Sequence, residues 1–195
     1  MQVHWDVGAQ VGVVQRFVTG AGPGASAPGP GPVGEVHAHV ALVPMLRAGP
    51  YIAHDISPVS GMPAREMTEA GVSVRFMPPL LAAPWRGWMF VGLGYARSYS
   101  PSHHVNAISP ATMALTDVFV AGAGGGILDV PIGFGLGYRP RRPWELFAEL
   151  GGRIGVAFTG SMYEKSQAQC VCAIAPYVGK DSFALSLSVG VSFDQ

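Results

Sequence analysis

Charged residues are scarce in this chain. Asp, Glu, Lys and Arg make up 12% of its 195 residues, about half the share that is usual in soluble domains. The 12 acidic and 12 basic side chains balance, so the chain has no basic field with which to bind nucleic acid. It also lacks a Gly-x-Ser-x-Gly motif, a phosphate-binding loop and zinc-ligand spacing. We therefore expect neither a cofactor nor a metal.

A long hydrophobic run is missing as well, although the chain is apolar. Hydrophobic residues make up 49% of it, and the mean hydropathy is +0.31. No run of about 18 uninterrupted apolar residues occurs, which excludes a transmembrane helix. The 27 glycines and 17 prolines argue against a helical bundle. An apolar composition without an apolar run is what a two-residue alternation produces.

Alternation of large apolar residues with small or polar ones dominates the last third of the chain. From Leu128 to Tyr138 the even positions are large and hydrophobic, and most odd positions are glycine. From Ser182 to Phe193 hydrophobic residues alternate with serine, alanine and glycine. A period of two places each set on one face of a strand. A bulky apolar face backed by a small polar face indicates the wall of a transmembrane β-barrel.

The same test predicts an all-β, eight-stranded antiparallel up-and-down barrel over residues 1–195. Its strands run from about His4 to Val18, Gly34 to Leu46, Tyr51 to Ser57, Glu66 to Met77, Trp85 to Tyr99, Leu128 to Tyr138, Trp144 to Thr159 and Ser182 to Phe193. The facing of the third strand stays open. Short links with proline, such as Arg47 to Pro50, alternate with mostly longer loops at about 19–33, 58–65, 100–126 and 160–181. Outer-membrane barrels have short periplasmic turns and long extracellular loops.

Aromatic residues gather at the predicted periplasmic ends of the strands. Amphipathic rings prefer the headgroup layer and form a girdle there. The predicted girdle consists of Trp5, Tyr51, Phe76, Trp85, Tyr138, Trp144 and Phe193.

The polar residues that alternate with the outward apolar residues along each strand are predicted to face the lumen. They are Asp6, Gln10, Glu35, His37, His39, Glu69, Arg75, Asp129, Glu145, Glu149 and Arg153. An eight-stranded barrel is just wide enough for its own side chains, so we expect a paired network that fills it rather than an ion path or a binding site. Acidic residues outnumber arginines in this set. Either the two histidines are protonated or some carboxylates are neutral.

Two histidines and two cysteines are further candidates. His37 and His39 share a face and could hold a metal with Glu35, although a paired lumen histidine is the commoner outcome. Cys170 and Cys172 lie in the last long loop, on the oxidising side of the cell. A disulfide between them is favoured, and it requires their Cα atoms to approach within about 7 Å. Metal binding, attachment of a lipid or partner, and two free thiols are the alternatives.

The 100–126 loop contains an apolar segment. Ser109 before Pro110 is a plausible start for a short helix that reaches toward Val120, and a strand extension is the alternative. Exposed apolar loop surface can mark a binding site, and a lid over the barrel mouth is equally consistent. The stretch from Gly20 to Pro32 has the composition of a flexible extracellular loop.

The chain resembles the small eight-stranded outer-membrane barrels of Gram-negative bacteria, the group of the OmpA transmembrane domain and OmpX. The segment Ser188 to Phe193 is similar to their terminal assembly signal, but Asp194 and Gln195 follow the aromatic residue that usually ends it. Trp88 to Tyr95 is similar to a strand of the family. The resemblance implies a monomer, contact with lipid and lipopolysaccharide, and recognition by the barrel-assembly machinery. It also implies export, and because Met1 to Asp6 has no signal-peptide character, we expect that a signal peptide has been removed.

A structural role, or adhesion to an extracellular partner through the loops, is the favoured function. The family includes lipid A acyltransferases and deacylases, so an outer-leaflet lipid-modifying enzyme that uses Ser102 and His103, in a cluster with Ser100 and His104, is an alternative. A soluble lipocalin-like ligand-binding barrel is another. It would need an apolar interior and a charged exterior, and 12% charge is too little for that.

Overall fold

Eight long strands form one closed barrel. The computed structural model describes residues 4–19, 28–60, 62–108, 114–120, 122–141, 143–163 and 180–195. The barrel strands are β1 (Trp5–Thr19), β2 (Gly31–Val43), β3 (Leu46–Val59), β4 (Met62–Phe76), β5 (Trp85–Ser100), β8 (Ala123–Arg141), β9 (Trp144–Thr159) and β10 (Lys180–Asp194). They are antiparallel, in the order β1-β10-β9-β8-β5-β4-β3-β2. The predicted eight-stranded antiparallel up-and-down barrel is confirmed.

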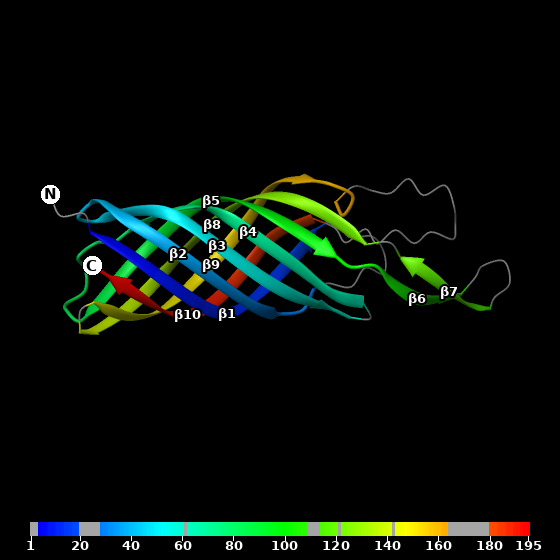
Figure 1. The fold of residues 1–195 in the computed structure, drawn as a ribbon, viewed down its shortest axis with the longest axis horizontal. Helices are drawn as coiled ribbons and strands as arrows, with labels where there is room; N and C mark the ends of the chain where they lie inside the picture. Colours follow the sequence, from blue (N-terminus) through cyan, green and yellow to red (C-terminus); the bar gives the residue numbers. More distant parts are fainter. Residues whose placement is uncertain are drawn as a thin grey trace.

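The two ends of the barrel differ. Figure 1 shows the chain termini at one end, which we call the short-turn end. A two-stranded sheet of β6 (His103–Ile108) and β7 (Leu115–Val120) extends beyond the opposite end, the loop end. The described residues contain no helix long and apolar enough to span a membrane.

Large hydrophobic side chains point outward. On β8, Leu128, Ile132, Phe134 and Leu136 are exposed, whereas Asp129 and most of the small residues between them are buried or half-buried. The same inversion runs around the wall, and charged side chains fill the interior. A soluble lipocalin-like barrel has the opposite arrangement, so that alternative is wrong.

The strands extend further toward the loop end than the alternation indicated. β2 begins at Gly31, β4 at Met62 and β8 at Ala123, so parts of the loops predicted at 19–33, 58–65 and 100–126 belong to the barrel wall. The ladder pairings continue into these segments, for example between Ser57 and Arg65. A ladder that continues into the rim satisfies backbone groups that a loop would leave to water.

The predicted turn from Arg47 to Pro50 is wrong. The chain reverses at Pro44 and Met45, and residues 46–59 form β3. Gly-Pro is a turn signal, but here it lies inside a strand. The β2–β3 pairing passes directly from His37–Tyr51 to Val40–Ala48, as expected for a proline that cannot donate to the ladder. A Cβ atom at Gly49 would collide with the carbonyl oxygen of Ala38, so the close approach requires glycine.

The shifted turn decides how β3 faces. Arg47, Tyr51 and Asp55 point inward, and Ile52 and Ile56 point outward. The prediction that Tyr51 belongs to the aromatic girdle is therefore wrong, because this residue lies well inside the strand and is 4% exposed. The structure places the other predicted girdle residues on the outer face at the short-turn end: Trp5, Phe76, Trp85, Tyr138, Trp144 and Phe193. Several of these rings touch, with centroids 4.9 Å apart for Trp85 and Tyr138.

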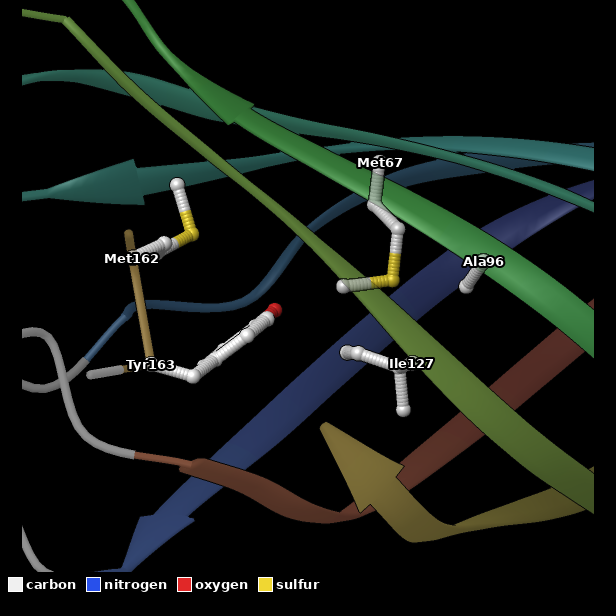
Figure 2. Packing of buried hydrophobic residues seen from close by; sticks show 5 residues of the cluster. All are labelled: Met67, Ala96, Ile127, Met162 and Tyr163. Carbon is white, nitrogen blue, oxygen red and sulfur yellow. The ribbon is translucent and has the colours of Figure 1, made fainter. Parts of the chain in front are cut away.

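An apolar cluster lies inside the barrel at the loop end. Met162 and Tyr163 follow β9 and pack against Met67, Ala96 and Ile127 of β4, β5 and β8. Figure 2 shows the Tyr163 ring directed toward Ile127. Met162 and Tyr163 fall in the predicted 160–181 loop, but they are 0% and 5% exposed. The chain after β9 therefore turns back into the barrel mouth at Met162 and Tyr163.

Candidate functional site

The candidate site is the charged interior of the barrel. The structure places every polar residue that was predicted to line the lumen inside it: Asp6, Gln10, Glu35, His37, His39, Glu69, Arg75, Asp129, Glu145, Glu149 and Arg153. Glu35 is half-buried and the others are buried. They form layers between the short-turn end and the loop end, with further charged residues that the sequence analysis missed.

Arg65 organises the loop-end layer. Its guanidinium lies 2.9 Å from Asp181 (Nη1 to Oδ1), and Nε donates to the Ser98 hydroxyl at 2.7 Å. Nη2 donates to the Tyr163 hydroxyl at 2.6 Å, and that hydroxyl donates to Asp181 at 3.1 Å. Burial raises the pKa of Tyr163, which keeps the hydroxyl protonated as a donor.

A second pair lies in the same half of the barrel. Both Nε and Nη2 of Arg16 donate to the carboxylate of Asp55, and the Nε distance is 3.0 Å. Asp129, which is 3% exposed, has one carboxylate oxygen without a hydrogen-bond partner among the described residues.

The middle layer links three strands through Arg153. This arginine pairs with Glu35 at 3.1 Å and also contacts Glu69. The Tyr51 hydroxyl donates to Glu69. Gln10 donates to Glu35 at 3.0 Å, so the four polar side chains around Arg153 form one connected group.

Glu149, which lies next to that group, accepts hydrogen bonds from three side chains. Arg75 donates to it at 2.8 Å, Gln10 at 2.9 Å and the indole nitrogen of Trp88 at 2.8 Å. A buried carboxylate is tolerated when charge-assisted hydrogen bonds surround it. The ring of Trp88 also packs against Phe147, with centroids 5.8 Å apart. The middle of the barrel is therefore filled with side chains.

Asp194 is the centre of the layer at the short-turn end. It accepts from Arg47 at 3.2 Å, from Arg86 at 2.8 Å, and from Arg139. Arg86 and Arg139 each also donate to Glu145 at 3.0 Å. Arg47 reaches on to Asp6 at 2.6 Å.

Only two of the interior arginines, Arg75 and Arg153, were predicted from the sequence. Five more lie inside the barrel, and each of them pairs with a carboxylate: Arg16, Arg47, Arg65, Arg86 and Arg139. The expectation of protonated histidines or neutral carboxylates rested on that incomplete set. The structure adds these five arginines and three further interior carboxylates, Asp55, Asp181 and Asp194, so the excess of carboxylates over arginines falls from four to two.

The histidine pair sits in a hydrogen-bonded environment. Among the described residues, Asp6, His37 and His39 form the one group whose ligand atoms could surround a metal, all within 4.8 Å of one another. Nη1 of Arg75 lies 3.2 Å from Nε2 of His37 and 3.9 Å from Asp6. His39 contacts Ser73 at 2.9 Å and Asp6 at 3.3 Å. A guanidinium beside His37 and Asp6 disfavours a second cation there. Glu35, the predicted third ligand, is 3.8 Å from His37.

The residues weighed for lipid chemistry do not converge in the described part of the chain. Nδ1 of His103 faces the carbonyl oxygen of Pro101 at 3.3 Å, and His104 pairs with Asp117 at 2.9 Å. Neither histidine contacts a serine hydroxyl there. Cys170, Cys172, Ser109 and Pro110 lie outside the described residues.

The β6–β7 hairpin is the second candidate site. The segment that was predicted as a helix or a strand extension contains strand β7, which pairs with β6 in a sheet of its own. Leu115 and Phe119 are 75% and 61% exposed on one face, beside the exposed His104–Asp117 pair. Because the hairpin extends away from the barrel (Figure 1), it does not form a lid.

Comparison with known proteins identifies the fold. No family model and no curated protein matches this sequence. Three solved structures are similar over almost the whole of both chains. Neisserial surface protein A has a TM-score of 0.59 and 14% identity, and the match covers 97% of this chain and 96% of that one. Ail, the attachment invasion locus protein of Yersinia pestis, has a TM-score of 0.55 and 8% identity, with 100% of both chains covered. A major outer membrane protein of Thermus thermophilus has a TM-score of 0.62 and 11% identity, with 100% of both chains covered. The chain thus has the fold of the small eight-stranded outer-membrane β-barrels.

Proposed function

We propose that this protein is a monomeric, integral outer-membrane barrel that is closed to solutes and recognises an extracellular partner through the β6–β7 hairpin. The observation that carries the proposal is the combination of an ion-paired interior with an apolar hairpin held beyond the barrel. Lipid and lipopolysaccharide would surround the wall, and the assembly machinery would insert it after export.

The outer face has the dimensions of a membrane-spanning wall. On β5 the outward residues from Trp85 to Tyr95 are aromatic or aliphatic apart from Gly87, and Met89, Val91 and Leu93 are about half exposed. Roughly ten residues at about 3.3 Å each, tilted by about 40°, span about 25 Å, the height of the apolar band in outer-membrane barrels. In water, such a surface would be an aggregation hazard.

The filled interior supports a role at the surface rather than in transport. Arg75, Glu149, Trp88 and Phe147 meet in the middle of the lumen. A solute would have to break several charge-assisted hydrogen bonds in order to pass.

The hairpin supports a role in recognition. Leu115 and Phe119 lie on a free face of a sheet outside the barrel, and large exposed apolar side chains are typical of protein-binding surfaces. Asp117 is the one Asp, Glu, Lys or Arg residue of the two strands, and it pairs with His104, so we infer an apolar patch on a protein partner. The name of the structural neighbour Ail, an attachment protein, agrees with this assignment.

Proteoliposomes test the proposal. The wild-type protein and a Leu115→Ser/Phe119→Ser variant are compared for binding to surfaces coated with fibronectin, laminin or collagen. Asn106→Ser, on the same exposed face, is the matched control. We expect the double variant to lose at least tenfold in retention while Asn106→Ser binds like the wild type. Equal retention of the wild type, the two variants and empty liposomes contradicts recognition. A protein that fractionates away from the outer membrane, without a heat-dependent shift in gel mobility, contradicts the barrel assignment.

A further inference from the structure

The outer wall contains a hollow near the short-turn end. Its volume is about 680 Å³, and residues of β1, β5, β8, β9 and β10 line it. The side chains at its floor and walls include Ala9, Ala148, Leu136, Val189, Trp85 and Tyr138.

Two alanines create this hollow. Ala148 pairs with Val189 of β10 and Leu136 of β8, and Ala9 pairs with Val191. These neighbours point outward, with exposed fractions of 59% for Val189 and 46% for Leu136. A methyl group between longer side chains leaves a depression in an otherwise convex wall.

The surroundings of the hollow indicate what fills it. It is apolar and lies within the outward band that the proposed function places in the membrane. A flexible acyl chain can enter such a depression and regain dispersion contacts with its floor. A second copy of the barrel would present a rigid convex wall, which would leave the depression empty.

One end of the hollow has the chemistry of a headgroup contact. Trp85 and Tyr138 pack together there with centroids 4.9 Å apart, and such amphipathic rings prefer the interface. Arg141 lies just beyond Tyr138 on β8 and is exposed. Among the described residues it forms no ion pair, unlike Arg139, which pairs with Asp194 and Glu145. An exposed cation at this depth attracts a lipid phosphate.

We propose that the hollow binds one phospholipid of the periplasmic leaflet, with an acyl chain over Ala148 and Ala9 and the phosphate beside Arg141. This inference rests on the proposed membrane location. It assigns one specific lipid-binding site to an outer wall whose other contacts with lipid are non-specific.

Native mass spectrometry of protein extracted from membranes into mild detergent, with analysis of the retained lipid, tests the site. We expect one phospholipid per wild-type protein and at least a tenfold lower occupancy in Ala148→Phe, because the ring would cover the floor of the hollow where the acyl chain lies. Ala70→Phe is the matched control, since Ala70 is an exposed alanine on the outer face of β4, away from the hollow. Arg141→Gln should retain less lipid than the wild type.

Three outcomes overturn the inference. The first is equal lipid retention by Ala148→Phe and Ala70→Phe. The second is a wild-type protein that retains no phospholipid. The third is a dimer by light scattering that Ala148→Phe converts to a monomer, which would assign the hollow to a second copy. Heat-dependent gel mobility and protease protection in proteoliposomes are measured on each variant. An inserted barrel without bound lipid contradicts only the site, whereas a failure to insert contradicts the proposed function.

Discussion

Arg65 and Asp181 pair across the full width of the barrel, with Nη1 and Oδ1 2.9 Å apart. Their strands, β4 and β10, are separated by three strands in either direction around the closed sheet. The two residues are 2% and 3% exposed. A contact of this kind joins halves of the wall that no ladder hydrogen bond connects directly.

Removal of Arg65 should destabilise the barrel strongly. Arg65→Ala leaves Asp181 buried without its cation, and loss of one partner of a buried pair costs about 3–5 kcal/mol. The free energy of unfolding, from urea titration of the protein in lipid vesicles, measures the change. Arg65→Met combined with Asp181→Leu should recover most of the loss, because it removes both charges and keeps the volume.

Arg97→Ala is the control for that measurement. Arg97 is exposed on the outer face of β5, in the same half of the barrel. We expect its substitution to change stability by about 0.5 kcal/mol or less. If Arg65→Ala behaves like Arg97→Ala, the pair does not support the fold.

Arg153 should matter for stability and not for conduction. It contacts both Glu35 and Glu69, so Arg153→Ala leaves two carboxylates without their main cation. We expect a loss of about 3 kcal/mol or more in unfolding free energy. Single-channel recording in planar bilayers should show no large steady conductance for either protein. A large stable channel formed by the wild type would refute the closed interior.

The fold was predictable because a barrel surrounded by lipid has an apolar outer face and a polar inner face, the reverse of a soluble protein. On β8 and β10 the apolar face is bulky and continuous, and the inner face is reduced to glycine, serine and a few charged residues. Only a wall with an apolar exterior and a narrow interior produces that contrast. β3 was the exception, because Gly49 and Pro50 mimic a turn, and an error in the turn reverses the facing of every residue that follows.

The interior charges were predictable only in part. Three of the missed residues lie an even number of positions from an inward residue of the same strand: Arg16 from Gln10, Arg86 from Trp88, and Asp194 from Ser188. Alternation continued along these strands would therefore have placed them inside the barrel. Arg47 and Asp55 were hidden by the misplaced turn.

Alternation along β10 does not predict that Asp181 points inward. The β1–β10 pairing shifts between Phe17 and Val18, and this irregularity turns Asp181 inward against the phase of the strand. The return of Met162 and Tyr163 into the barrel mouth depends on contacts with β4, β5 and β8. These strands are distant in the sequence, so no local sequence pattern predicts the contacts.

Neutralisation of Asp194 should loosen the short-turn end. Asp194→Asn removes the negative charge that Arg47, Arg86 and Arg139 share, and it replaces one of the accepting carboxylate oxygens with an amide group that donates. An excess of positive charge remains there. We expect a loss of about 2–4 kcal/mol, since hydrogen bonds to charged groups contribute about 1.5–3 kcal/mol each and neighbouring arginines repel. Urea unfolding in vesicles measures this loss. Asp117→Asn in the exposed hairpin pair serves as the control, and equal stability of the two variants contradicts the role of Asp194.

Gly135 should tolerate no side chain, because the interior ring of Trp88 occupies the space beside it. A Cβ atom at Gly135 would collide with the Trp88 indole. Gly135→Ala should therefore lower stability by about 1–3 kcal/mol through overpacking, measured by urea unfolding in vesicles. Gly124→Ala on the same strand is the control, because the nearest atom to its new Cβ is 3.6 Å away, an ordinary contact. Gly135→Ala/Trp88→Phe should recover part of the loss, since the smaller ring frees space. Equal stability of the two alanine variants would show that the interior can rearrange around Trp88.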